Sequence, residues 1–109
     1  MRFELDQYVN LRPAKLLPGV PTPLANVKPG DMDMIIVREL TGGIYYGTPR
    51  GIFGEGPETR GMNTMTYTRA EIERVSRMAF QLARNRRKKL TSVDKSNVLE
   101  TSQLWRKVV

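Results

Sequence analysis

Lysine, tyrosine and carboxylate side chains are the groups in this chain that could carry acid–base chemistry. The 109 residues contain no histidine and no cysteine. The commonest general base and the commonest transition-metal ligand are therefore absent, and disulfides and thiolate metal sites are excluded. Any proton transfer must fall to lysine, tyrosine, aspartate or glutamate.

Lys95 is the most suggestive of these groups because of its place in the chain. The sequence predicts a short strand at residues 90–93 and a helix at residues 100–109, so Lys95 stands between a strand and a helix. Open α/β sheets place active-site groups at such junctions. From position alone, a solvent-exposed lysine without a function is the commoner outcome. The residues around it suit a turn and a helix cap, namely Asp94, Ser96 and Asn97.

Two strands and a loop are predicted before residue 40. Residues 8–12 alternate apolar and polar side chains, as a half-exposed strand does. Pro13 removes a backbone donor, which favours a sheet edge or the end of the strand. Residues 32–37 form the clearest strand, and the prolines and glycines of residues 18–30 predict a long surface loop before it.

A glycine-rich arm is predicted at residues 44–67. Its glycines are too many for a helix, and residues 52–53 and 62–67 could pair as a protruding hairpin. A two-stranded ribbon is not stable alone, so the arm should find a partner surface.

A long basic helix is predicted after the arm. Thr68 and Glu71 have the spacing of a capping box at its start. The helix is expected to run to residue 89 and to carry eight basic residues against two acidic ones, which predicts a solvated face. One apolar stripe at helical spacing should face the core, and it comprises Ile72, Val75, Met78, Ala79 and Leu82.

Length and charge narrow the function classes. A chain of 109 residues can build a core but not a two-domain enzyme. The formal charge of +7 makes an acidic partner worth considering. A nucleic-acid-binding domain remains an alternative, ranked lower because no aromatic residues interleave with the basic run. No apolar run reaches membrane-spanning length and no signal peptide opens the chain, so the expected location is cytoplasmic, with neither nucleic acid nor membrane as partner.

Several short strings fall in a consistent order along the chain and carry a family resemblance. They are Arg2, Asp6 and residues 10–13, 37–39, 41–45 and 92–100. In this order they resemble the β-decarboxylating dehydrogenases, the family of 3-isopropylmalate, tartrate/malate and isocitrate dehydrogenases, over essentially the whole chain. Residues 38–45 are most similar to the 3-isopropylmalate branch, whereas residues 6–33 are more similar to the tartrate/malate branch.

The resemblance implies an α/β fold, the central segment of the isopropylmalate dehydrogenase-like fold. A mixed sheet flanked by helices and a protruding β-arm at residues 44–67 are expected. Residues 1–109 would form a single partial domain, an internal fragment of a larger enzyme that dimerises through the arm.

The implied activity is NAD-dependent oxidative decarboxylation of a 2-hydroxy diacid. The expected reaction converts 3-isopropylmalate to 4-methyl-2-oxopentanoate in leucine biosynthesis, with tartrate or D-malate as the alternative substrate. NAD and Mg²⁺ or Mn²⁺ are the implied cofactors. The family's glycine-rich opening and its downstream metal-binding aspartates are missing, so no metal ligand is expected here and the fragment alone should be inactive.

The resemblance also assigns roles to individual residues. Arg2, Arg12 and Arg38 would bind the substrate carboxylates, because arginine offers paired donors that match carboxylate geometry. Without the motif, each would be an ordinary surface salt bridge worth roughly 0–1 kcal/mol.

The remaining roles concern proton transfer and the cofactor. By resemblance, Lys95 would be the base for oxidation, Tyr45 the acid that protonates the enol, and Asn97 a residue near the nicotinamide. A lysine can act as a base where burial or neighbouring cations favour its neutral form. Without the motif, Tyr45 would be a half-buried strand residue and Asn97 a helix cap.

Overall fold

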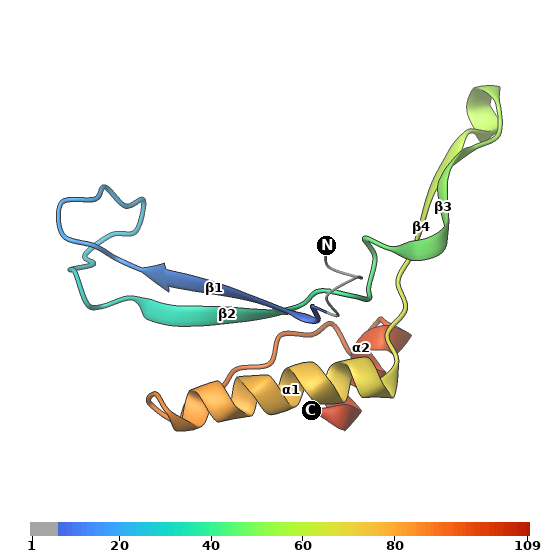
Figure 1. Cartoon of the computed structure of the whole chain (residues 1–109). Helices are drawn as coiled ribbons and strands as arrows, with labels where there is room; N and C mark the ends of the chain where they lie inside the picture. Colours follow the sequence, from blue (N-terminus) through green and yellow to red (C-terminus); the bar gives the residue numbers. More distant parts are fainter. Residues whose placement is uncertain (1–6) are drawn as a thin grey trace.

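The computed structural model describes residues 7–109, in which two small sheets and two helices follow one another along the chain (Figure 1). The expected α/β class is confirmed. In the described part, the strands form two separate antiparallel pairs, β1–β2 and β3–β4, where a mixed sheet was expected. The elements are β1 (Val9–Lys15), β2 (Asp33–Glu39), β3 (Gly47–Phe53), the 3₁₀ turn η1 (Gly56–Glu58), β4 (Arg60–Thr64), α1 (Arg69–Arg84) and α2 (Glu100–Val108).

The β1–β2 ribbon has two unlike faces. In its register Asn10 lies opposite Arg38 and Arg12 opposite Ile36, so these four side chains share one face. That face is open, and Ile36 is 51% exposed. The other face carries Glu39 and packs on α1, which runs beneath the ribbon (Figure 1).

Both strands of the ribbon match the sequence expectation. The first continues through Pro13 to Lys15, two residues beyond the proline. Every strand of a two-stranded sheet is an edge strand, where a missing donor is tolerated. The residues between the strands form the predicted loop, with Gly19 and Gly30 at positive φ.

Helix α1 begins as its sequence predicts. The Thr68 hydroxyl oxygen accepts a hydrogen bond from the Glu71 N–H at 3.2 Å, and the Glu71 carboxylate accepts from the Thr68 N–H at 2.8 Å. The apolar stripe faces inwards at its start, where Ile72 and Val75 are 0% and 3% exposed. These two residues and Leu16 are the buried apolar residues of the described chain.

The second half of the stripe is only half-buried. A groove of about 620 Å³ opens there between residues 31–37, the second half of α1 and residues 89–93. Ala79 and Leu82 line this groove, and both are less covered than Ile72.

The predictions for residues 85–93 were wrong. Helix α1 ends at Arg84, not at residue 89, and residues 90–93 are not a strand. Asn85 leaves the helical path, and Lys88 adopts a φ of 60°, which a continuing right-handed helix does not allow. A strand also needs a neighbour for its backbone groups, and within residues 7–109 residues 90–93 pair with none.

Two basic residues past α1 bind the start of β2 instead of extending the helix. The Arg86 guanidinium lies 2.9 Å from the Asp33 carboxylate, and Arg87 donates to the Asp33 backbone carbonyl. The hydrogen bond from Arg86 lowers the pKa of Asp33 below its usual value. The predicted solvated face is thus partly engaged in ion pairing.

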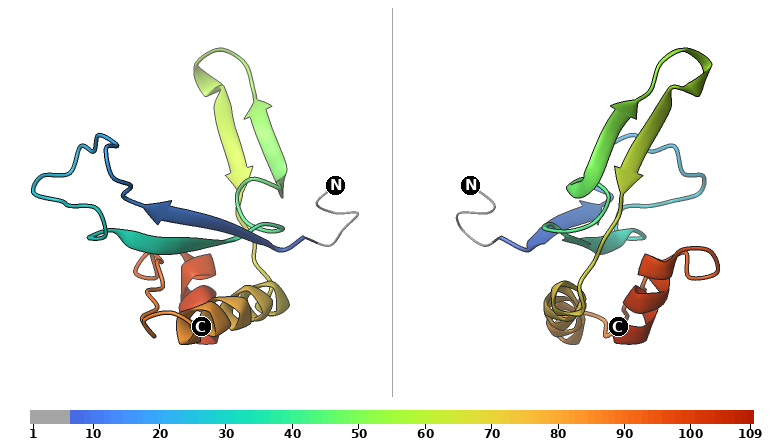
Figure 2. Two further views of the ribbon diagram at one scale, coloured as in Figure 1. Left: turned by 60° about the vertical axis from the view of Figure 1, so that its left-hand side comes forward. Right: turned by 90° about the vertical axis from the view of Figure 1, so that its right-hand side faces the viewer.

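The β3–β4 hairpin leaves the body as a separate arm (Figure 2). Ile52 pairs with Gly61 and Phe53 with Arg60, and the register shifts between Gly47 and Gly51. No residue of the arm's strands is buried, and Ile52 is 80% exposed. In residues 7–109 no helix is long and apolar enough to cross a membrane.

Candidate active site

Two of the predicted substrate-binding arginines share the open face of the ribbon. Arg38 lies opposite Asn10, and Arg12 lies one pair further along on the same face. The Asn10 side-chain oxygen accepts a hydrogen bond from Arg12 Nε at 2.7 Å, which restrains the arginine beside the strand. The third predicted arginine, Arg2, lies outside the described residues.

Tyr45 joins this face from the turn that follows β2. The Arg38 guanidinium carbon lies 4.6 Å from the centre of the Tyr45 ring, within cation–π range. Tyr45 is 59% exposed and occupies a turn, so the alternative of a half-buried strand tyrosine was wrong. The structure therefore brings two predicted site residues, Arg38 and Tyr45, into direct contact.

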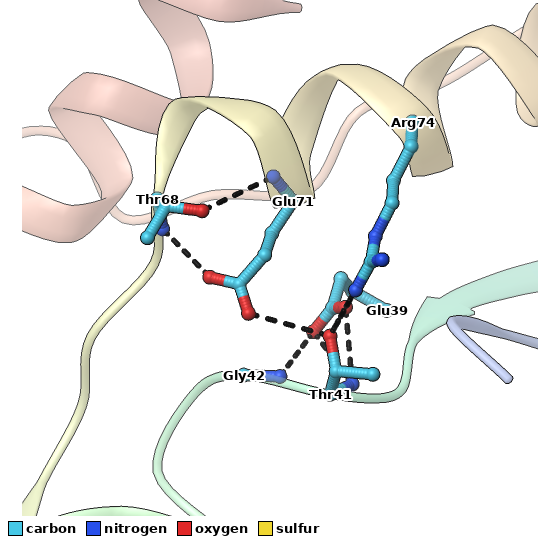
Figure 3. Close-up of polar contacts among 6 residues, drawn as sticks. All are labelled: Glu39, Thr41, Gly42, Thr68, Glu71 and Arg74. Carbon is cyan, nitrogen blue, oxygen red and sulfur yellow. Dashed lines mark hydrogen bonds and ion pairs between the residues drawn. The ribbon is translucent and has the colours of Figure 1, made fainter. Parts of the chain in front are cut away.

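A buried carboxylate holds the start of this turn (Figure 3). Glu39 is 7% exposed and accepts hydrogen bonds from the N–H groups of Thr41, at 3.0 Å, and Gly42, at 2.7 Å. The Thr41 hydroxyl donates to the same carboxylate at 2.6 Å and accepts from Arg74 of α1, also at 2.6 Å. Glu39 and Thr41 fall within the strings that resemble the family, but the sequence pattern predicted no role for either residue.

Gly43 makes the next step of the turn possible. Its φ is +86°, a conformation that residues with a side chain rarely adopt, and a Cβ there would lie 2.4 Å from the Tyr67 hydroxyl oxygen. Its N–H donates to the Thr66 carbonyl at 2.9 Å, which ties the turn to the chain just before α1. Burial and, secondarily, the Glu39 charge raise the pKa of Tyr67.

Lys95 occupies a different, solvent-exposed turn before α2. The Lys95 carbonyl accepts from the N–H groups of Val98 and Leu99, at 3.2 and 3.0 Å, and the Asp94 carboxylate accepts from Ser96 N–H at 3.0 Å. The predicted turn chemistry is therefore present without the predicted strand.

Two side chains of helix α2 donate hydrogen bonds to residues of this segment. Trp105 donates its indole N–H to the Ser92 hydroxyl and Arg106 donates to the Ser96 hydroxyl, both at 3.2 Å. Within residues 7–109 no hydrogen bond, ion pair or ring contact joins Lys95 or Asn97 to Arg12, Arg38 or Tyr45. The folded chain thus presents an arginine–tyrosine pair and, separately, the Lys95–Asn97 turn.

This order of elements and residues matches a known family over the full sequence. The isocitrate/isopropylmalate dehydrogenase family matches residues 1–109. The chain belongs to this family. Among its relatives, the 3-isopropylmalate dehydrogenase of Aquifex aeolicus is 56% identical over the whole chain, which covers 30% of that relative.

Other members of the isocitrate/isopropylmalate dehydrogenase family match the chain with similar identity and coverage. The 3-isopropylmalate dehydrogenases of Synechococcus sp. (strain JA-3-3Ab) and Thermosynechococcus vestitus are 51% and 54% identical, over 100% and 97% of this chain. The chain covers 29% and 30% of them, so it spans about 30% of the length of these curated relatives.

The residues described here do not make a divalent metal site. Hard cations need several oxygen ligands, and residues 7–109 contain no group of three or more acidic side chains placed to hold a metal ion. The buried Glu39 carboxylate, the strongest single candidate, already accepts hydrogen bonds from three donor groups, the N–H and hydroxyl of Thr41 and the N–H of Gly42.

The described residues lack a phosphate-binding turn for a dinucleotide, although Asn97 offers an amide. Phosphates bind at glycine-rich turns that open a helix, but neither residues 62–68 before α1 nor residues 90–99 before α2 contain a glycine. Asn97 offers an exposed amide and no phosphate cradle. The candidate site on this chain therefore offers guanidinium groups that can bind carboxylates, and a phenol and an amine that can transfer protons.

Proposed function

We propose that the complete enzyme to which this chain corresponds is a 3-isopropylmalate dehydrogenase. It would oxidise and decarboxylate 3-isopropylmalate to 4-methyl-2-oxopentanoate, a step of leucine biosynthesis. The observation that carries the proposal is the Arg38–Tyr45 contact, at 4.6 Å, beside Arg12 on one open face. The names of the relatives support this substrate over tartrate, D-malate or a nucleic acid.

The arginines bind the substrate. Arg12 of β1 and Arg38 of β2 belong to neighbouring cross-strand pairs on the same face of the ribbon. Their two guanidinium groups can therefore hold the carboxylates of one diacid. Arg2 is proposed as a third ligand from the family resemblance. The exposed side chains of Met34 and Ile36 on the same face could line the apolar side of the site.

Proton transfers fall to Lys95 and Tyr45. As the C2–H bond breaks with loss of hydride, the Lys95 amine takes the proton from the C2 hydroxyl, and the carbonyl forms. The resulting β-keto carboxylate loses carbon dioxide, and the electrons of the broken C–C bond form an enolate. Its oxygen takes back the proton that Lys95 removed, which gives the enol. The Tyr45 phenol then protonates the enol carbon, and the enol hydroxyl proton returns to solvent.

The hydride acceptor and the metal are assigned to the complete enzyme and not to the residues described here. We propose NAD as the acceptor, with Asn97 near its nicotinamide, and Mg²⁺ or Mn²⁺ as the metal, both by family resemblance. No step above is routed through the metal, because no acid cluster in residues 7–109 could hold it. The 109-residue chain by itself is expected to be inactive.

The arm is proposed to pair with a second copy. The outer edges of β3 and β4 are unpaired in the described chain, and the 80% exposed Ile52 adds apolar surface. Residues 1–109 would then form part of a substrate-binding and dimerisation domain. Deleting residues 48–60 should lower the sedimentation coefficient from that of a dimer to that of a monomer, and an unchanged value argues against the arm as the contact.

The proposed activity is tested by replacing the matching segment of the Aquifex aeolicus enzyme with residues 1–109. The chain aligns over its whole length at 56% identity, so the exchanged segment has a matching segment in the relative throughout. NADH formation should be fastest with 3-isopropylmalate and slower with D-malate or tartrate. A folded hybrid that prefers malate, or that turns over none of the three, argues against the proposal.

A further inference from the structure

We propose that Glu39 is a positioning residue for the protonation step, because its buried carboxylate fixes the turn that places Tyr45 against Arg38. The inference rests on the proposed function, since it gives this turn the task of presenting the acid. Glu39 itself faces α1, on the side of the ribbon away from Arg38, and so acts through the backbone.

The carboxylate is more thoroughly bonded than any other acid in the described residues. Both of its oxygens accept, one from the N–H and hydroxyl of Thr41 and the other from the N–H of Gly42. Breaking these contacts would leave a buried polar group without hydrogen-bond partners, which costs free energy. The Arg74 guanidinium lies 3.9 Å away and adds a compensating charge.

The same group of contacts anchors the turn to α1. Thr41 Oγ1 accepts from Arg74 at 2.6 Å and lies 3.3 Å from the carboxylate of Glu71, the acid that caps the helix start with Thr68 (Figure 3). The first turns of α1 and the end of β2 are therefore joined by side chains about 30 positions apart in sequence. The turn cannot shift without breaking its contacts with Glu39 of β2 and with Arg74 of α1.

Geometry carries this constraint to Tyr45. The turn continues through Gly43, whose carbonyl accepts from the N–H groups of Tyr46 and Gly47 at 3.4 and 3.2 Å. Tyr45 thus lies between two restrained ends of the turn. Glu39 binds Thr41 and Gly42 before it, and the Gly47 N–H donates to the Gly43 carbonyl after it. Loosening the entry should let the exposed phenol leave the Arg38 face, and a misplacement of about 1 Å can cost ~10²-fold in rate.

The test uses Glu39→Gln, which keeps the shape and replaces one acceptor oxygen with a donor that must face another donor. Glu73→Gln is the matched control, because Glu73 is a half-exposed acid on α1 that, within residues 7–109, pairs with Arg69 at 3.6 Å. In the 109-residue chain, hydrogen exchange at the Thr41 and Gly42 amides should accelerate in Glu39→Gln and stay unchanged in the control. Exchange within β1 should not change.

In the Aquifex aeolicus hybrid, the first turnover and the steady rate of NADH formation together distinguish a positioning role from a general loss of structure. Hydride transfer precedes protonation, so rapid mixing with 3-isopropylmalate should give a first turnover of NADH at the parent rate. The later steady rate should fall by ~10²-fold in Glu39→Gln. The ratio kcat/KM should stay within a few-fold of the parent, because the slowed step follows the loss of carbon dioxide. The control should match the parent in both phases.

Thr41 supplies a second pair of variants if Glu39→Gln does not fold. Thr41→Val keeps the shape without the hydroxyl and should slow the steady rate, whereas the conservative Thr41→Ser should restore most of it. Faster Thr41 and Gly42 exchange with an unchanged steady rate overturns the inference, as does an equal loss of both phases. A parent hybrid without turnover overturns the proposed function instead, and unchanged exchange in Glu39→Gln then overturns the positioning role.

Discussion

The two turns that carry the predicted proton-transfer groups are built very differently. The Tyr45 turn is pinned by a buried carboxylate, by α1 and by a contact between Arg38 and the Tyr45 ring. The Lys95 turn is exposed and closed mainly by hydrogen bonds between near neighbours. The chain thus preorganises the proposed acid, Tyr45, within its own fold, while nothing in residues 7–109 fixes the amine of the proposed base, Lys95.

The largest effect is expected when the amine of the exposed Lys95 turn is removed. In the complete enzyme, Lys95→Met should abolish oxidation of the hydroxy acid, a loss of ~10²–10⁴-fold. Given the β-keto acid directly, the same variant should still decarboxylate it at an appreciable rate. Stopped-flow NADH formation and carbon dioxide release measure the two steps, and near-normal turnover would remove Lys95 from the mechanism.

Tyr45→Phe tests the other turn and should show the opposite pattern. The phenol is lost while the ring can still face Arg38, so substrate binding and hydride transfer should be largely kept. Protonation of the enol should slow by up to ~10²–10⁴-fold, and the first NADH turnover should exceed the steady rate. Equal slowing of both phases would place Tyr45 outside the protonation step.

Gly43→Ala addresses the backbone that shapes the Tyr45 turn. The added Cβ would meet the Tyr67 hydroxyl at 2.4 Å in a backbone conformation with φ of +86°. The strain should lower the free energy of unfolding by about 1–3 kcal/mol, measured by urea denaturation of the 109-residue chain. Gly61→Ala is the control, because a Cβ there meets nothing within 4 Å and φ is not positive, and equal stability of the two variants contradicts the close approach.

The smallest expected effect lies far from both turns, where Arg86 meets Asp33. The pKa of Asp33 is lowered in the folded chain, so its ionised form favours folding above the usual value of 3.8. This contribution should disappear as the pH falls through the lowered pKa. Asp33→Asn should therefore be slightly less stable than the parent at neutral pH, and the gap should close in acid. A gap that persists in acid, or one equally large for the exposed Glu55→Gln, would refute the pairing.

Local patterns in the sequence were sufficient for the elements whose signals are local. The capping box at Thr68, the apolar spacing that begins at Ile72 and the alternation before Pro13 each depend on neighbours a few residues apart. The same reasoning failed at residues 85–93, because a run of basic residues resembles a helix tail until Arg86 finds Asp33. That ion pair spans more than 50 positions and leaves no periodic trace.

The sequence by itself determined the family, the α/β class and the set of residues that could bind a diacid and move its protons. Only the tertiary structure decided which of them meet. Arg38 and Tyr45 touch because Glu39 points inwards on β2 and bonds the turn that follows, and Thr41 reaches Arg74 across 33 positions. Such contacts depend on how β2 packs on α1, and packing geometry is a property of the folded chain that no local pattern encodes.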